Sequence, residues 1–159
     1  MNLKQFFSAL FFAALVAVAC NTNPDSKEST GVEGSGNEKA AITEGADPKG
    51  VGPHQNVTLT HPLDESMITT GKTVYEVKCQ SCHKLTDEKL VGPGWKGVTD
   101  RRTPEWIMNF TTNTEEMLSK DTAAQNMLEV CLVKMPNQGV AEPDARGLLE
   151  YMRKNDGKQ

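Results

Sequence analysis

The residues most able to carry chemistry stand in one pentapeptide, Cys79-Gln80-Ser81-Cys82-His83. Two thiols separated by two residues, with an imidazole directly after the second, form the attachment pattern of c-type haem. The two thiols would bond the two vinyl groups of one haem, and the histidine would be the proximal ligand of its iron. The pattern therefore predicts one covalent haem c, attached through Cys79 and Cys82, and one-electron chemistry.

Two other chemistries also use a CxxC pair. A structural zinc site needs four ligands, usually as two pairs, but the other cysteines, Cys20 and Cys131, stand alone. The remaining histidines, His54 and His61, are spaced too irregularly to form a second pair. A redox dithiol is expected near a βαβ pattern, whereas the flanking sequence has helical periodicity. The sequence favours haem over both.

The second axial ligand of a haem iron separates electron transfer from ligand chemistry. Met135 directly precedes Pro136, at the start of a loop that follows a predicted helix, and a stiff loop suits a side chain that must reach the iron. Most other methionines fall on apolar helical stripes, where Met usually fills the core. The sequence favours Met135 over the other candidates, which are Met67, Met108, Met117, Met127, Met152, His61 and His54.

Helices must position these ligands. The first is expected to run from a capping Asp64 to Cys79, with one face formed by Met67, Gly71, Val74, Tyr75 and Lys78. A second begins at residues 103–105 (TPE), which supply a capping Thr and a Pro at the first helical position. That helix carries Trp106, Ile107 and Phe110.

Two further helices are expected toward the C-terminus. One begins near Asp121 and ends before Pro136, with a stripe of Ala124, Met127, Leu128, Cys131 and Leu132. The last begins near Asp144 and buries Ala145, Leu148, Leu149 and Met152. The pattern predicts an all-α domain over residues 61–159, with about four to five helices wrapped around one haem.

The first 60 residues have a different composition. Lys4 and the apolar run 6–19 form a signal peptide, residues 1–19, that is shorter than the ~20 apolar residues of a membrane span. The signal peptide ends directly before Cys20, as in a bacterial lipoprotein signal. Cleavage that releases a soluble protein is the alternative. Residues 20–60 then form the lipidated Cys and a flexible, disordered linker, rich in Gly and Pro and without aromatic residues. This predicts export and a lipid anchor in a bacterial membrane, facing the periplasm or the cell surface.

The charge pattern limits the partners. The chain has a formal net charge of −4, and residues 61–159 hold 13 basic and 15 acidic residues. No basic block is present, which argues against a nucleic-acid partner. Electron-transfer partners bind through small and transient interfaces, so the net charge does not identify them. The protein itself is expected to be a monomer.

These motifs occur in the order found in class I monohaem cytochromes c, which residues 62–155 resemble. The matching features are CxxCH, the segments 91–98 (VGPGWKGV) and 134–137 (KMPN), and a C-terminal helix with Leu148, Leu149 and Tyr151. The resemblance implies that the carbonyl of Pro93 accepts the ring N–H of His83. It also places Trp95 where Leu is usual, as part of the haem pocket.

The resemblance implies an electron carrier and not an enzyme. Its donor would be a quinol-oxidising complex, and its acceptor a terminal reductase or oxidase. Residues 79–97 and 101–108 also resemble cytochromes encoded with bacterial nitrous-oxide reductases, which makes such a reductase a candidate acceptor. Two alternatives stay open: a haem enzyme or a gas or redox sensor with an open sixth coordination site, and an electron-entry subunit of a larger respiratory complex.

Overall fold

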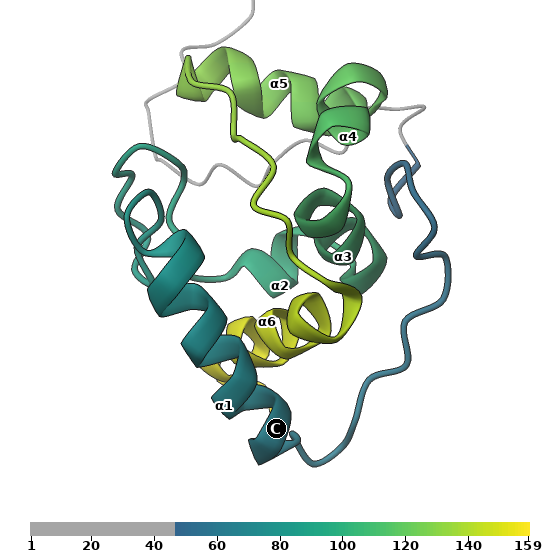
Figure 1. The fold of residues 1–159 in the computed structure, drawn as a ribbon, viewed down its shortest axis with the longest axis vertical. Coiled ribbons are helices and arrows are strands. Elements are labelled where there is room, and N and C mark those ends of the chain that lie inside the picture. The colour runs from purple at the N-terminus through teal and green to yellow at the C-terminus, as the bar shows by residue number, and fades with distance from the viewer. Residues whose placement is uncertain (1–46) are drawn as a thin grey trace, which may run out of the picture. The chain divides into compact units, whose positions relative to one another are not determined.

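The computed structural model describes residues 47–159; the predicted signal peptide, Cys20 and the linker as far as residue 46 lie outside the described residues. The described part of the chain contains six α-helices, one π-helical turn and no strand, which confirms the predicted all-α fold (Figure 1). In chain order these are α1 (Glu65–Val74), η1 (Tyr75–Cys79), α2 (Val98–Arg101), α3 (Pro104–Thr112), α4 (Thr114–Lys120), α5 (Thr122–Cys131) and α6 (Glu142–Asn155).

Helices α1 and α6 form the most extensive helix pair of the domain and cross in the lower part of Figure 1. Gly71 and Gly147 lie at the crossing, and both are buried. On α6 the side chains of Ala145, Leu148 and Leu149 are each 1% exposed, so the predicted inward face is confirmed. This pairing fixes the helix that leads directly into Cys79.

Two of the helix starts follow the capping residues read from the sequence. Asp64 accepts hydrogen bonds from the backbone N–H groups of Ser66 and Met67, at 2.8 and 3.0 Å. The hydroxyl of Thr103 accepts from the N–H of Trp106 at 3.2 Å. Each bond satisfies a donor that the first helical turn leaves free.

Asp121 has two tasks in the core. Its Oδ1 accepts from the N–H of Ala124 at 2.8 Å, which caps α5, and from the indole Nε1–H of Trp106 at 3.1 Å. The guanidinium of Arg102 lies 4.7 Å from the centroid of the Trp106 ring. The indole of α3 is therefore tied to the start of α5 by a buried polar contact.

The helix boundaries differ from the predictions at several points. The expected continuous first helix changes to a π-helical turn at Tyr75, and α6 begins two residues early because Pro143 is accepted in its first turn. Helix α4 was not predicted. Leu132, expected on the apolar stripe of α5, instead caps that helix with φ 60° and is 85% exposed. A residue in the left-handed region no longer follows the helical stripe.

Residues 47–60, which were predicted to be part of the linker, pack against the helices in the structure. Residues 47–63, here called the N-terminal strap, pack against α3, α4 and α6, on the opposite side of Figure 1 from the CxxCH loop. Asn109 of α3, 0% exposed, accepts from the N–H of His54 at 2.9 Å and donates to the carbonyls of Lys49 and His54 at 2.9 Å. The strap satisfies its backbone through side chains of the helices, so it needs few apolar residues of its own.

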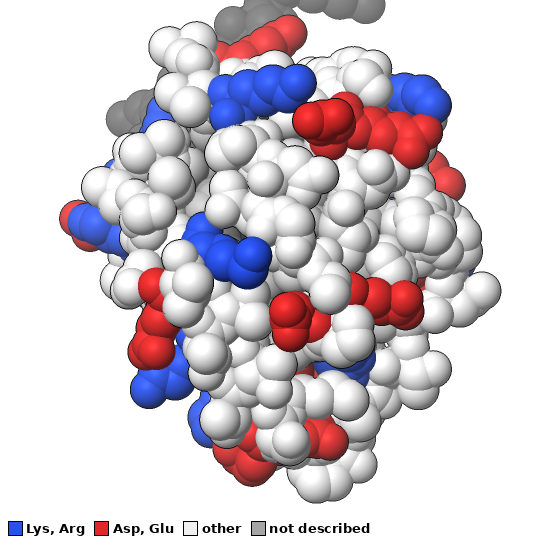
Figure 2. Space-filling view, viewed as in Figure 1, with Lys and Arg blue, Asp and Glu red and all other residues white. Residues whose placement is uncertain are grey.

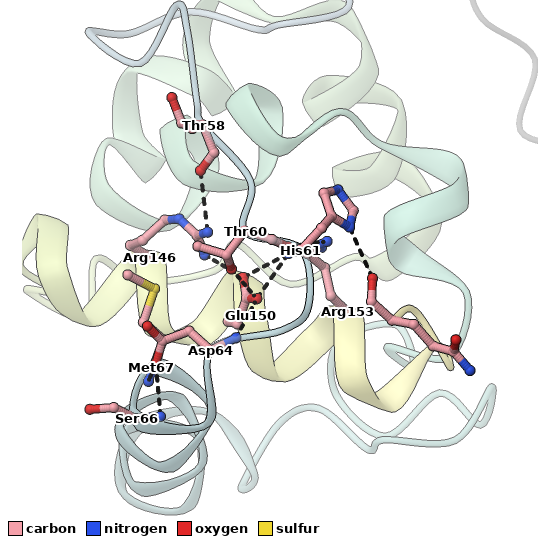
Figure 3. Close-up of polar contacts among 10 residues, drawn as sticks. Thr58, Thr60, His61, Asp64, Ser66, Met67, Arg146, Glu150 and Arg153 are labelled. Carbon is pink, nitrogen blue, oxygen red and sulfur yellow. Dashed lines mark hydrogen bonds and ion pairs between the residues drawn. The ribbon is translucent and has the colours of Figure 1, made fainter.

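A buried carboxylate joins the end of the strap to α6 (Figure 3). Glu150, 0% exposed, accepts from the hydroxyl of Thr60 at 2.8 Å and from Arg146 at 2.6 Å. Arg153 donates to both carboxylate oxygens at 2.9 Å and to the carbonyl of Thr60 at 3.2 Å. Arg153, in the last turn of α6, is therefore half of a buried ion pair with Glu150.

The described residues include no helix that is long and apolar enough to cross a membrane.

Candidate haem site

The pentapeptide of the site is folded by the end of the first helix. Cys79 ends the π-helical turn, and its carbonyl accepts from the N–H groups of Cys82 and His83, at 3.0 and 2.9 Å. The phenol of Tyr75 donates to the carbonyl of His83 at 2.8 Å. Both thiols and the imidazole are thus held on one tight turn.

The chemistry of the thiols weighs against a zinc site or a reactive dithiol. Cys79 is buried and Cys82 is half-buried, and neither is in a disulfide. Burial raises the pKa of Cys79 to about 11; Lys78 opposes the rise and Cys82 adds to it. Because the thiolate is the nucleophile, the raised pKa of Cys79 disfavours a reactive dithiol at neutral pH. Among residues 47–159, no group of three or more His, Cys, Asp or Glu side chains could hold a metal ion. Thioether formation with the two vinyl groups of a haem would use one sulfur for each vinyl group.

The imidazole of His83 is oriented by the glycine-rich loop. Its Nδ1 lies 2.9 Å from the carbonyl oxygen of Pro93, which can only accept, so Nδ1 carries the proton and Nε2 stays available to an iron. Burial lowers the pKa of His83, while the bond to Pro93 opposes that shift. A neutral imidazole with a free Nε2 is the form that binds haem iron.

The glycines of this loop are required by close contacts. The N–H of Gly92 donates to the carbonyl of Cys82 at 2.9 Å, which folds the loop back onto the pentapeptide. A Cβ at Gly92 would lie 2.3 Å from Cε1 of His83, and a Cβ at Gly94 would lie 2.2 Å from the carbonyl oxygen of Thr86. Any side chain at Gly92 would push the imidazole away from its present orientation.

Trp95 packs against the imidazole of His83. It is buried, and its ring centroid lies 5.6 Å from that of His83 and 5.0 Å from that of Tyr75. Tyr75 in turn packs against Tyr151 of α6, with 5.7 Å between centroids. The structure therefore brings together five of the predicted site residues, Cys79, Cys82, His83, Pro93 and Trp95.

Met135 comes from a different part of the chain, the loop between α5 and α6, where it is half-buried. Several other predicted candidates are engaged elsewhere. The sulfur of Met117 accepts from the N–H of Val51 at 3.0 Å. The ring of His61 is bonded to the carbonyl of Gln159 at 3.0 Å, and that of His54 to the hydroxyl of Thr112 at 3.2 Å.

These residues fit a haem c. The two sulfurs could form the thioethers, and Nε2 of His83 could bind the iron because Nδ1 is protonated and bonded to Pro93. The absence of a side chain at Gly92 gives the imidazole its room. The sequence profile of the family described as Cytochrome c matches residues 68–156. The chain belongs to the cytochrome c family.

Solved structures agree with this assignment. This cytochrome c is similar to a cytochrome c from Rhodothermus marinus, with 30% identity over 71% of this chain and 100% of the other, at a TM-score of 0.67. An engineered cytochrome c from the same organism has 28% identity, covers 70% of this chain and 100% of its own, and gives a TM-score of 0.66. The engineered form described with a bound carbene intermediate matches with 28% identity, the same coverage and a TM-score of 0.63. No curated protein matches the sequence.

Membership of this family identifies the cofactor and the general activity of the protein. This cytochrome c holds one covalent haem c through its cysteines, and its general activity is monohaem electron transfer. Sequence reasoning missed Gly92 and the phenol of Tyr75 as parts of the site. A Gly-Pro-Gly sequence signals a special backbone, but only coordinates show that the imidazole is what requires it.

Proposed function

We propose that this cytochrome c is a mobile electron carrier, and not an enzyme, with His83 and Met135 as the two axial ligands of its iron. When bound, haem c supplies one-electron exchange between ferric and ferrous iron. The observation that carries the proposal is the bond between His83 Nδ1 and the Pro93 carbonyl, because it fixes the proximal ligand in its iron-binding form. Met135 would supply a thioether from the loop between α5 and α6, and that thioether would occupy the remaining ligand position of the iron.

The choice of Met135 among the methionines rests on burial and location. Met108, Met117 and Met152 are 2%, 0% and 5% exposed within the helical core, where they fill space between helices. Among residues 47–159, Met135 is the methionine that lies on a loop between helices, next to a proline that restricts the backbone. This placement supports ligation by Met135 over the helical methionines and over the two histidines that are bonded elsewhere.

The rival function is ligand chemistry at an open sixth coordination site, as in a haem enzyme or a gas or redox sensor. The engineered Rhodothermus marinus cytochrome is described with a carbene intermediate, which keeps this alternative in view. The two functions differ in the spin state of the iron and in its reaction with carbon monoxide. An optical spectrum recorded with and without carbon monoxide separates them.

The surface supports brief contacts with redox partners. Six large apolar side chains are exposed on the segments next to the pentapeptide and around the end of α5, namely Val77, Leu90, Val91, Val130, Leu132 and Val133. Figure 2 shows positive and negative side chains scattered over a largely uncharged face, without a continuous basic stripe. A small apolar contact with weak electrostatic steering suits a transient partner.

We assign these partners by redox class. A quinol-oxidising complex would reduce the cytochrome, and a terminal reductase or oxidase, with a nitrous-oxide reductase as one candidate, would oxidise it. Stopped-flow mixing of the reduced monomer with each purified acceptor tests this, with rapid oxidation expected from the true acceptor. Stable co-purification with one complex would instead support a fixed electron-entry subunit.

The anchor is a separate part of the proposal. A lipid on Cys20 would hold the domain at a bacterial membrane, facing the periplasm or the cell surface, and residues 21–46 would be the tether. With the strap included in the domain, this tether is shorter than the sequence alone suggests. Cys20→Ser is expected to move the haem-loaded protein from the membrane fraction to the soluble fraction. Wild type and Cys20→Ser with the same distribution between the two fractions would contradict lipidation.

A further inference from the structure

The segment that carries Met135 has few polar contacts with the rest of the domain. Within residues 130–139, the bond from Gln138 Nε2 to the Pro136 carbonyl and the bond from the N–H of Gly139 to Asn137 are internal to the loop. Among the described residues, two hydrogen bonds join this segment to other parts of the protein outside α5. Both donors are lysine ammonium groups, and both acceptors are backbone carbonyls.

The two lysines belong to the part of the chain around the pentapeptide. Lys78 immediately precedes Cys79, and its Nζ donates to the carbonyl of Gln138 at 2.8 Å. The backbone of Lys89 forms an isolated antiparallel β-bridge with that of His83. The Nζ of Lys89 donates to the carbonyl of Val130 at 3.0 Å. Each lysine is therefore fixed to the turn that holds the thiols and the proximal imidazole.

The acceptors lie on either side of Met135 in the sequence. Val130 is in the last turn of α5, and Gln138 closes the Met-Pro turn through its own bond to Pro136. Holding these two carbonyls fixes both ends of the loop relative to the proximal turn. Ammonium-to-carbonyl bonds are stronger than neutral ones because the donor is charged.

We propose that Lys78 and Lys89 are positioning residues that clamp the Met135 loop against the proximal turn and so hold the methionine on the iron. This inference rests on the proposed ligation by Met135. The clamp acts on the sixth ligand through the backbone, since neither lysine belongs to the donor set itself. Without the clamp, the loop spends a larger fraction of time with the sixth position accessible. The apparent affinity for an added ligand then rises in proportion to that fraction.

The test is a titration of the ferric holoprotein with imidazole, followed by the loss of the long-wavelength sulfur-to-iron band. Variants are Lys78→Ala, Lys89→Ala and the double variant, with Lys78→Arg and Lys89→Arg as conservative replacements that keep a donor. Lys72→Ala is the control for charge, because Lys72 is exposed on α1 and pairs with Glu76 at 3.7 Å. Thermal unfolding is recorded for every variant.

The clamp predicts that the double variant binds imidazole about tenfold more tightly than wild type, with smaller effects for each single alanine variant. The arginine variants and Lys72→Ala are expected to match wild type. A lysine that only stabilises the fold would lower Tm without changing the imidazole affinity, and that result would overturn the clamp. A wild type without the sulfur-to-iron band would overturn the clamp together with the Met135 assignment, so the two failures are distinguishable.

Discussion

Gly71 of α1 and Gly147 of α6 meet so closely that a Cβ on Gly71 would lie 2.0 Å from the carbonyl oxygen of Gly147. A Cβ on Gly147 would meet the N of Gly71 and the carbonyl of Met67 at 3.0 Å. A side chain at Gly71 would therefore clash more severely than one at Gly147. The crossing matters for the site because α1 continues directly into the turn that carries Cys79.

The crossing predicts unequal effects of the same substitution. Gly71→Ala is expected to destabilise the holoprotein by about 3 kcal/mol, because backbone must move to admit the methyl group. Gly147→Ala is expected to cost about 1 kcal/mol or less, since the milder contact is offset by the better helix propensity of Ala. Denaturant unfolding of both variants measures the difference. Equal losses of stability would contradict this account of the crossing.

Gly92 predicts a spectroscopic change at the proximal ligand. The methyl group of Gly92→Ala would displace the His83 ring and weaken its bond to Pro93, which makes the imidazole a poorer donor to the iron. We expect the reduction potential to shift by tens of millivolts, where about 59 mV corresponds to a tenfold change in a one-electron equilibrium. Potentiometric titration measures it, with Gly147→Ala as the control. An unchanged potential would show that the orientation of the ring is set elsewhere.

Glu150 predicts a pH dependence of stability. Burial would raise its pKa, but hydrogen bonds from Arg146, Thr60 and Arg153 outweigh burial and hold the pKa below its usual range. A lowered folded-state pKa stabilises the protein above the unfolded value of about 4.3, and that contribution is lost as the pH falls through the folded-state pKa. Glu150→Gln is therefore expected to cost about 3 kcal/mol at pH 7, where it leaves Arg153 buried without its counter-charge.

Urea unfolding of Glu150→Gln and wild type at pH 7 and at pH 3 tests this prediction. The gap in unfolding free energy between the two proteins should narrow at the lower pH. Glu76→Gln removes an exposed ion-pair partner of Lys72 and should change stability little at either pH. A gap that stays constant with pH would mean that ionisation of Glu150 does not stabilise the fold.

Asn109 predicts that the N-terminal strap can be loosened from the domain. Asn109→Ala removes the partners of the His54 N–H and of two strap carbonyls, and we expect a loss of about 2–3 kcal/mol. Trypsin should then cleave faster at Lys49, because that bond becomes accessible when the strap opens. Asn126→Ala, on the exposed side of α5, is the matched control. Wild-type cleavage rates in Asn109→Ala would contradict the role of the strap contacts.

The residues that sequence reasoning placed correctly carry local signals. The helix starts at Asp64 and Thr103 follow from capping chemistry within three residues of each position, and the start near Asp121 follows from the apolar stripe after it. Cys79 and Cys82 were found because covalent attachment of haem requires a fixed short spacing.

The features that sequence reasoning missed depend on distant partners. The strap has only scattered apolar residues, and its contacts run to side chains far along the chain, as from His54 to Asn109 and from Thr60 to Glu150. No periodicity marks such a segment, so its glycines and prolines indicated a linker. The same holds for the Lys78 and Lys89 bonds, whose acceptors are backbone carbonyls that every residue possesses.

Axial ligation by His83 and Met135 is the central claim, and an optical spectrum tests it most directly. The matured protein is recorded ferric and ferrous, with and without carbon monoxide, for wild type, Met135→Ala and the control Met127→Ala. We predict low-spin wild-type iron that does not react with carbon monoxide. Its long-wavelength sulfur-to-iron band should be lost in Met135→Ala and kept in Met127→Ala. A high-spin or carbon-monoxide-reactive wild type would contradict the account and favour an enzyme or a sensor.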